Sequence, residues 1–377
     1  MKTQSKSIQI FLFAILISGL QPVVAFAKSK TKAANKISIV LPVDTAVKIG
    51  KLPNGFTYYI RHNEEPKNRV TIYLVNKVGS ILETEEQCGL AHFLEHMAFN
   101  GTKHFPKNEL VSYLQKSGVK FGGDLNAFTS FDETVYQLPL PTDNPELLKN
   151  GFQIMRDWAQ DATLDSIEIE KERGVILEEK RLNSNAQQRL RDQFFPIITN
   201  NSRYSKRLPI GTDEVLTGFK HTTLRDFYKW YRPNLQALVV VGNIDVAETE
   251  KTIEAMFSDL KNPVPAPEHP EYKILLNGKN QFYSTTDKEV QMPTIQMLGK
   301  FEKEKLVTRE DYKQNISRTL LNFIMSERFS DLSKQPNSPY VQAGSSVSGL
   351  VANIDAFSTS IVAESSKLEN AVKTVWT

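Results

Sequence analysis

The chain has 377 residues, with 46 Lys and Arg against 43 Asp and Glu, so its formal net charge is only +3. This length is sufficient for two domains, and the balanced charge argues against a nucleic-acid-binding protein. The single cysteine excludes an intramolecular disulfide.

The first 27 residues have the pattern of a secretory signal peptide. Lys2 and Lys6 precede an apolar run at 8–20, and a small-residue site follows at 25–27. The run is too short to span a bilayer, and no later segment is apolar enough to do so. We therefore expect an exported protein, periplasmic or else secreted, whose residues 28–44 form a flexible N-terminus.

After an alternating strand at 69–78 comes the segment HFLEH at 92–96. On a helix, His92 and His96 project from one face one turn apart, so both can bind the same metal ion. Glu95 lies to one side of this pair, where it is poorly placed as a ligand. It is well placed to take a proton from a water at that metal. The alternative is a core helix with two hydrogen-bonded histidines.

Two elements follow along the chain. A helix is expected to begin at Pro106 and to stop at Gly118. A Gly pair at 122–123 then leads into a segment rich in Thr, Phe, Val and Tyr, which we interpret as one strand.

A helix capped by Asn144 precedes a second helix at 166–182, SIEIEKERGVILEEKRL. Glu172 and Glu179 share one face of that second helix, two turns apart. Apolar residues flank the two glutamates: Ile169, Val175, Ile176 and Leu182. A buried charge is costly unless compensated, and a cation bound by His92 and His96 would compensate it. A buried Glu–Arg pair is the alternative, and geometry does not decide which glutamate contacts the metal.

The remaining chain reads as a helix at 222–231, a strand at 237–244 buried on both faces, and a helix at 246–260. The Pro-rich segment 263–270 is the best domain boundary. A similar order then restarts, which weakly indicates duplication. Its elements are a strand at 290–299, a helix at 309–332, strand-like sequence at 340–362 and a helical pattern at 368–377. Residues 270–377 contain neither His nor Cys, so this part cannot hold an N/S-rich zinc site.

The segments GLAHFLEHMAFNGT at 89–102 and ERGVILEE at 172–179 are similar to the pitrilysin-type (M16, insulysin-like, inverzincin) zinc peptidases. Within that family the chain most resembles exported bacterial members of the PqqL-like kind, from about residue 45 onward. The resemblance implies an α+β fold of two related domains, each with a mixed or antiparallel sheet packed by helices. We expect a catalytic domain at 45–262, a linker at 263–270 and an incomplete, non-catalytic repeat at 271–377.

Carried over residue by residue, the resemblance makes His92, His96 and Glu179 the ligands of one Zn²⁺ ion in the catalytic domain, and Glu95 the general base. Glu172 would be a supporting carboxylate that orients the ligands. The separation between His96 and Glu179 is longer than expected for the family, which indicates either a loop insertion or Glu172 as the ligand. The intact seven-residue spacing of the two glutamates favours Glu179.

The family's Asn-Ala-x-Thr strand is an exposed edge that accepts the substrate as an added strand, which implies substrate contacts at Asn126 and Ala127. Family members enclose a peptide substrate between two halves, in one long chain or in two associated chains, so we also expect a second half. The predicted function is that of an exported zinc endopeptidase acting on peptides or unfolded segments. The alternatives are a non-catalytic partner or assembly subunit, and a metal-dependent hydrolase of another substrate.

Cys88 lies four residues before His92. A role as a metal ligand is conceivable, but we interpret it as a small, partly buried apolar residue. The other histidines have no ligand-like spacing, and we interpret them as surface or core residues: His62, His104, His221 and His269.

Overall fold

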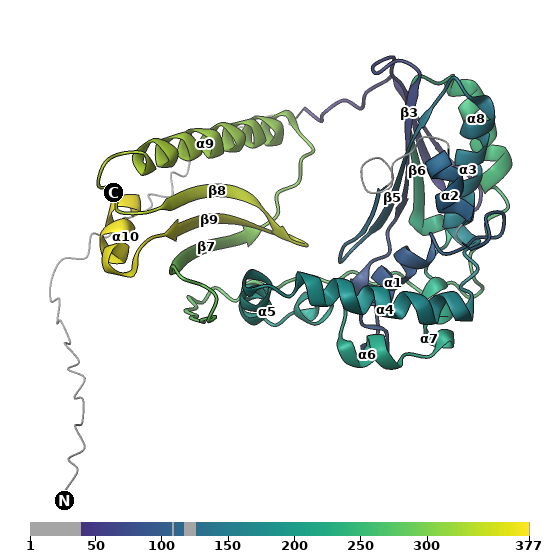
Figure 1. Cartoon of the computed structure of the whole chain (residues 1–377). Coiled ribbons are helices and arrows are strands. Elements are labelled where there is room, and N and C mark those ends of the chain that lie inside the picture. The colour runs from purple at the N-terminus through teal and green to yellow at the C-terminus, as the bar shows by residue number, and fades with distance from the viewer. Residues whose placement is uncertain (1–38, 108, 117–125, 377) are drawn as a thin grey trace, which may run out of the picture. The chain divides into compact units, whose positions relative to one another are not determined.

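A computed structural model describes residues 39–107, 109–116 and 126–376 (Figure 1). The predicted signal peptide, most of the predicted N-terminal segment 28–44 and the Gly pair at 122–123 lie outside the described residues. Among the helices that are described, none combines the length and the apolar character needed to cross a membrane.

A six-stranded sheet forms the first part of the structure, in the order β1-β2-β6-β3-β5-β4. Its strands are β1 (Val47–Lys51), β2 (Thr57–His62), β3 (Arg69–Asn76), β4 (Asn126–Thr129), β5 (Thr134–Pro141) and β6 (Gln236–Gly242). β6 pairs in parallel with β2, and every other neighbouring pair is antiparallel. The sheet is therefore mixed, as the predicted α+β class requires.

One face of this sheet carries the core. Helices α3 (Pro145–Gln160) and α8 (Val246–Phe257) lie on the same side of it (Figure 1). Along β3 and β6, residues at alternate positions are buried and those between them are partly exposed. The prediction that the strand at 237–244 is buried on both faces is thus wrong, because helices cover only one face. We attribute the apolar sequence at 237–244 to the central position of β6 in the sheet, and not to burial of both faces.

The strand predicted after the Gly pair is in fact a hairpin. β4 and β5 pair in antiparallel register, with Asn126 opposite Gln137 and Thr129 opposite Thr134. The turn between them is closed by a hydrogen bond of 2.8 Å from the Ser130 N–H to the Glu133 carbonyl. Among the described strands, β4 pairs only with β5 and so lies at the edge of the sheet.

The other helices of this part of the chain are α1 (Leu90–Met97), α2 (Glu109–Lys116), α4 (Ser166–Asn183), α5 (Ala186–Ile198), α6 (Asp213–Gly218) and α7 (His221–Tyr228). Asn144 and Asp165 accept backbone N–H bonds at the starts of α3 and α4, as N-cap residues do. Helices α5 and α6 were not predicted.

Helix α4 buries only part of its predicted apolar face. Ile169 and Ile176 are fully buried, whereas Val175 is 52% exposed and Leu182 is 67% exposed. The expectation that all four pack beside the glutamates is therefore only half right.

A separate three-stranded antiparallel sheet follows, in the order β7-β9-β8. Its elements are β7 (Thr294–Glu302), α9 (Arg309–Ser333), β8 (Gln342–Val351), β9 (Ile354–Val362) and α10 (Leu368–Trp376). The predicted order of strand, long helix, strand sequence and final helix is confirmed. The small buried apolar cluster here consists of Phe329, Tyr340, Ile361, Ala363 and Ala371.

Candidate metal centre

Helix α1 is short and mostly buried, and it presents both histidines of the HFLEH segment. Its apolar residues Phe93, Leu94 and Met97 are buried in the main core. The rings of His92 and His96 lie edge to face, with centroids 4.6 Å apart. The i, i+4 spacing therefore places the two imidazoles side by side, as the sequence predicts.

A carboxylate from α4 completes this group. The two Nε2 atoms of His92 and His96 are 3.2 Å apart. Glu179 Oε2 lies 3.4 Å from Nε2 of His96 and 3.8 Å from Nε2 of His92. Among the described residues, these three form the single group of His, Cys, Asp and Glu side chains that could hold a metal ion.

The spacing of the three donor atoms fits zinc. With zinc–ligand distances of about 2.0–2.2 Å and tetrahedral angles, neighbouring donor atoms lie about 3.4 Å apart. The observed separations of 3.2, 3.4 and 3.8 Å bracket that value. Two imidazole nitrogens at 3.2 Å also need a proton or a cation between them, because their lone pairs would otherwise face each other.

The outer nitrogen of each histidine has different surroundings. Nδ1 of His96 is 2.8 Å from Oε1 of Glu172, whose Oε2 accepts a bond of 2.5 Å from the side-chain amide of Asn100. This arrangement favours the His96 tautomer with its proton on Nδ1, which leaves Nε2 as the ligand atom. Nδ1 of His92 is buried and has no hydrogen-bond partner among the described residues.

The electrostatics of the two rings differ accordingly. Burial and, to a smaller extent, the neighbouring His96 lower the pKa of His92 to about 4. Burial also acts to lower the pKa of His96, but its hydrogen bonds to Glu172 and Glu179 outweigh this effect and raise the pKa to about 9. Burial would raise the pKa of Glu172, yet its bonds to His96 and Asn100 keep that pKa below its usual range.

Glu95 lies next to the three donors without belonging to them. It is buried, and its Oε2 accepts a hydrogen bond of 2.7 Å from the hydroxyl of Thr129 on β4. Burial raises the pKa of Glu95, and the bond from Thr129 partly offsets that increase. A carboxylate with a raised pKa beside a metal site suits proton transfer near neutral pH.

The edge strand β4 carries the two predicted substrate-contact residues. The side chain of Asn126 is exposed and that of Ala127 is partly buried, while Thr129 contacts Glu95. The backbone of β4 facing away from β5 is unpaired among the described residues. An extended peptide could therefore add to the sheet at a point joined to Glu95 by one hydrogen bond.

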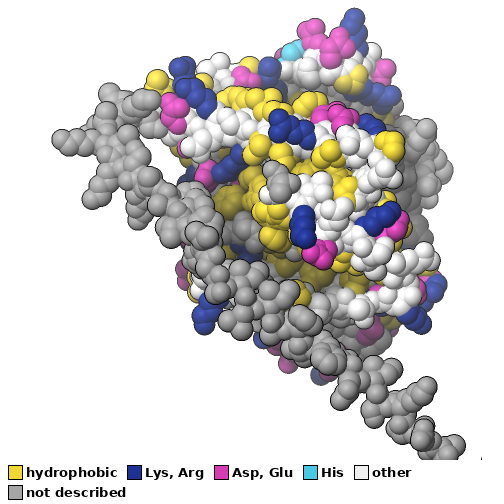
Figure 2. Space-filling model, turned by 90° about the vertical axis from the view of Figure 1, so that its left-hand side faces the viewer, with side chains coloured by type: hydrophobic (Ala, Val, Ile, Leu, Met, Phe, Trp, Pro, Cys, Tyr) yellow, Lys and Arg dark blue, Asp and Glu magenta, His cyan; other side chains and the backbone are white. Residues whose placement is uncertain are grey.

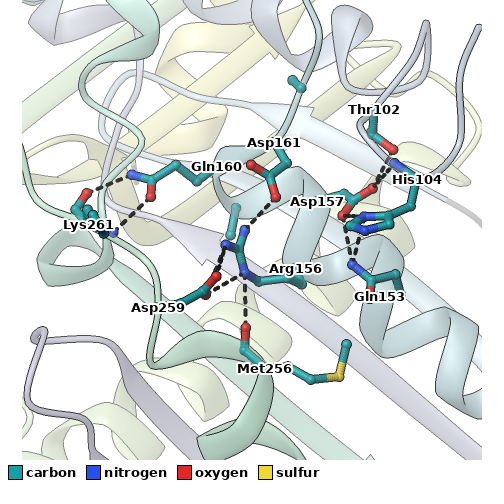
Figure 3. A network of polar contacts seen from close by, with 12 residues as sticks. Thr102, His104, Gln153, Arg156, Asp157, Gln160, Asp161, Met256, Asp259 and Lys261 are labelled. Carbon is teal, nitrogen blue, oxygen red and sulfur yellow. Dashed lines mark hydrogen bonds and ion pairs between the residues drawn. The ribbon is translucent and has the colours of Figure 1, made fainter.

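Cys88 and His104 are not among the three donor residues. Cys88 is buried, and its thiol faces the backbone carbonyls of Thr84 and Lys206. Burial raises the pKa of this thiol, as for a small buried residue rather than a metal ligand. His104 bonds to Asp157, which also accepts from Thr102, and this network ties the segment after α1 to α3 (Figure 3).

Two neighbours of the site had no assigned role in the sequence analysis: Asn100, which follows α1, and Thr129 of the Asn-Ala-x-Thr segment. Both lie inside the segments that carried the family resemblance, which is the signal that could have identified them.

Comparison with known proteins shows which family the chain matches. The family "Insulinase (Peptidase family M16)" matches residues 58–208, and "Peptidase M16 inactive domain" matches residues 218–376. A probable zinc protease PqqL of Haemophilus influenzae is 35% identical over 78% of this chain and 32% of its own length. A PQQL-like zinc protease of Arabidopsis thaliana is 32% identical over 81% of this chain and 32% of its own length.

The first half of the periplasmic protease PqqL from Escherichia coli has a similar structure. Its TM-score is 0.81 at 29% identity, over 89% of this chain and 72% of that one. The chain thus spans about a third of the length of the curated relatives described above.

Proposed function

Because the chain belongs to the M16 peptidase family, we propose that it forms the zinc-binding part of an exported endopeptidase that hydrolyses peptides or unfolded polypeptide segments. The observation that carries this proposal is the convergence of three donor atoms from two helices, with a buried carboxylate beside them. The family and the named zinc proteases among its relatives support zinc as the metal.

In this proposal His92, His96 and Glu179 hold the zinc ion. Glu172 orients His96 through Nδ1, and its own orientation depends on Asn100. We assign Glu179 rather than Glu172 as the ligand, because Glu179 faces both Nε2 atoms whereas Glu172 faces the opposite nitrogen of His96.

Zinc, when bound, would supply Lewis-acid activation of a water molecule and of the scissile carbonyl. Glu95 acts as the general base and takes a proton from the attacking water. It then gives that proton to the leaving amine nitrogen, which completes the cleavage. Thr129 holds one oxygen of Glu95, so the other oxygen is available for the proton.

The substrate would bind by adding a strand to β4, with contacts at Asn126 and Ala127. This mode relies on backbone hydrogen bonds, so it suits extended chains of varied sequence. It also favours a peptidase over a metal-dependent hydrolase of another substrate class.

We further propose a second M16 half, in the same longer chain or in a partner subunit. Exposed apolar side chains are frequent on α9, which supports packing against further polypeptide. They are Tyr312, Ile316, Leu320, Leu321, Phe323 and Ile324. Figure 2 shows hydrophobic side chains among scattered charges on the face that lies to the left in Figure 1.

The proposed domain boundary is the Pro-rich segment 263–270. Along the chain, β6 is the last strand to join the first sheet and β7 is the first strand of the second sheet, and this segment lies between them. Within this segment, the Pro267 carbonyl accepts a bond of 2.5 Å from Arg232.

The N-terminal sequence and the periplasmic relative support an exported, periplasmic protein.

The test is Glu95→Gln, which keeps the shape of the side chain but removes the base. We expect peptide hydrolysis to fall by a factor of about 10²–10⁴, with zinc content unchanged. Glu178→Gln, at an exposed position paired with Arg181, serves as the matched control. Unchanged turnover in Glu95→Gln would refute the mechanism, and zinc binding without any hydrolysis by the wild type together with its second half would favour a non-catalytic partner subunit.

A further inference from the structure

A fully buried carboxyl group lies at the start of α1. Glu83 has no exposed surface, although it precedes the helix by several residues. Its Oε2 accepts a hydrogen bond of 3.0 Å from the Gly89 N–H, and its Oε1 accepts one of 2.8 Å from the Ala91 N–H. Both oxygens therefore bind the first turn of the helix that carries His92 and His96.

The first turn of α1 needs such an acceptor from outside. The first N–H groups of a helix lack intrahelical partners, and a side chain at the N-cap normally binds one of them. Here the N-cap is Gly89, with φ +100°, and there is no side-chain cap and no acidic residue in the first turn. Glu83 supplies the two hydrogen-bond acceptors that these N–H groups lack within the helix.

Glu83 is itself fixed through its backbone. Its carbonyl accepts a bond of 2.8 Å from Nε of the buried Arg207 and another bond from Arg203. Arg203 also bonds to the Ile81 carbonyl at 2.8 Å. Because these bonds use the backbone of the segment, the carboxyl group remains available for the two amides of α1.

A close backbone contact closes the other side of the helix start. A Cβ on Gly89 would lie 2.8 Å from Cα of Gly211, and a Cβ on Gly211 would lie 2.5 Å from Cα of Gly89. Neither position can therefore carry a side chain without displacement of the backbone. The start of α1 is held between the segment at 81–83 and the loop that contains Gly211.

We propose that Glu83 is a positioning residue for the metal centre, which fixes the first turn of α1 so that His92 and His96 face Glu179 at ligand distance. This inference rests on the proposed zinc site. Ala91 immediately precedes His92, so the bond from its N–H to Glu83 acts on the peptide next to the first ligand. The role concerns metal affinity, and Glu83 contacts neither the ligands nor the substrate strand in the structure.

Glu83→Gln tests this role with little change in volume. One acceptor oxygen is replaced by an NH₂ group, which faces a backbone N–H that also donates. Glu85→Gln is the matched control, because Glu85 is a nearby carboxylate that bonds to the same Arg207 but is 80% exposed. The readout is the zinc dissociation constant, measured by competition with a chelator on protein shown to be folded by circular dichroism.

We expect Glu83→Gln to raise the zinc dissociation constant about 10–100-fold, as mutations that disturb the support of metal ligands do. Glu85→Gln should stay within about twofold of the wild type, since exposed ion pairs contribute little. If Glu83→Gln does not fold, Glu83→Asp, which keeps the carboxyl group but shortens the reach, should give a smaller loss of affinity.

A folded Glu83→Gln or Glu83→Asp with wild-type zinc affinity would overturn the inference, as would equal losses in Glu83→Gln and Glu85→Gln. These outcomes differ from a failure of the proposed function. If the wild type binds no zinc, the metal site itself is wrong, whereas wild-type binding with an unaffected variant removes only the role of Glu83.

Discussion

Helices α1 and α4 contribute to the same site but are held in the structure in different ways. α1 has eight residues and is fixed at both ends, by Glu83 at its start and by a bond of 2.9 Å from the Trp158 indole to the Ala98 carbonyl at its end. α4 has 18 residues, is capped by the exposed Asp165 and buries only one side.

This difference shows which parts of the fold fix the positions of the side chains in the site. Two of the proposed ligands and the proposed base lie on the buried, short helix, so their mutual geometry is set by the core of the first sheet. The third proposed ligand, Glu179, has a side chain that is 37% exposed, and its position depends on how α4 packs. Four experiments test this difference between α1 and α4.

The largest effect should come from His92→Ala on α1. Removing one of three protein ligands should abolish stoichiometric zinc binding, and with it any hydrolysis. Zinc content after dialysis measures this, with Glu178→Ala on the exposed side of α4 as the control. Full zinc occupancy in His92→Ala would remove the ligand assignment.

Two substitutions on α4 should separate its buried side from its exposed side. Ile176→Ala removes a fully buried side chain and should lower the free energy of unfolding by about 2–5 kcal/mol. Leu182→Ala, at a position 67% exposed, should change it by only about 0.5 kcal/mol or less. Urea unfolding measures both, and equal losses would mean that α4 is covered on both sides.

The carboxyl group at the start of α1 should make stability depend on pH. Burial raises the pKa of Glu83 from 4.5 to about 8, despite the opposing bonds from Ala91 and Gly89 and the nearby Arg207 and Arg203. The folded protein then keeps a proton that the unfolded chain releases. The stability contribution is complete below about pH 4.5 and is lost as the pH rises through about 8.

The glutamine in Glu83→Gln does not titrate. Raising the pH from 5 to 8 should therefore lower the unfolding free energy of the wild type relative to that of the variant. Each pKa unit corresponds to about 1.4 kcal/mol, and arginine side chains keep their charge over this range. Chemical unfolding in the presence of a chelator measures the difference. Parallel pH curves for the two proteins would show that Glu83 is ionised throughout.

The smallest of the four effects should be that of Glu172→Gln. Losing the carboxylate that fixes Nδ1 of His96 should weaken zinc binding about 10–100-fold without abolishing it. If Glu172 were the ligand instead of Glu179, its substitution would remove zinc as completely as His92→Ala does. Comparing zinc dissociation constants for Glu172→Gln and Glu179→Gln decides between the two assignments.

Sequence reasoning was most successful where one short segment contains the whole pattern. The spacing of His92 and His96 and the seven-residue spacing of Glu172 and Glu179 predicted two helix faces, and the structure brings those faces together. The hairpin at 126–141 was missed because its turn, Ser-Phe-Asp-Glu, contains neither Gly nor Pro.

Glu83 could not be recognised from the sequence, because its role depends on packing. A carboxylate that caps a helix from several residues upstream leaves no capping-box spacing to detect. The exposure of Val175 and Leu182 could not be predicted for a related reason. Helical periodicity shows which residues share a face of the helix, but not what covers that face.

The position of β6 has a consequence for the order in which the chain can fold during synthesis. All side chains assigned to the site have been synthesised once residue 179 has been added. Among the described strands, β2 and β3 are nevertheless connected by hydrogen bonds only through β6, which ends at Gly242. A nascent chain shorter than this holds two unconnected pieces of sheet, so stable capture of metal must wait for a strand that contributes no ligand.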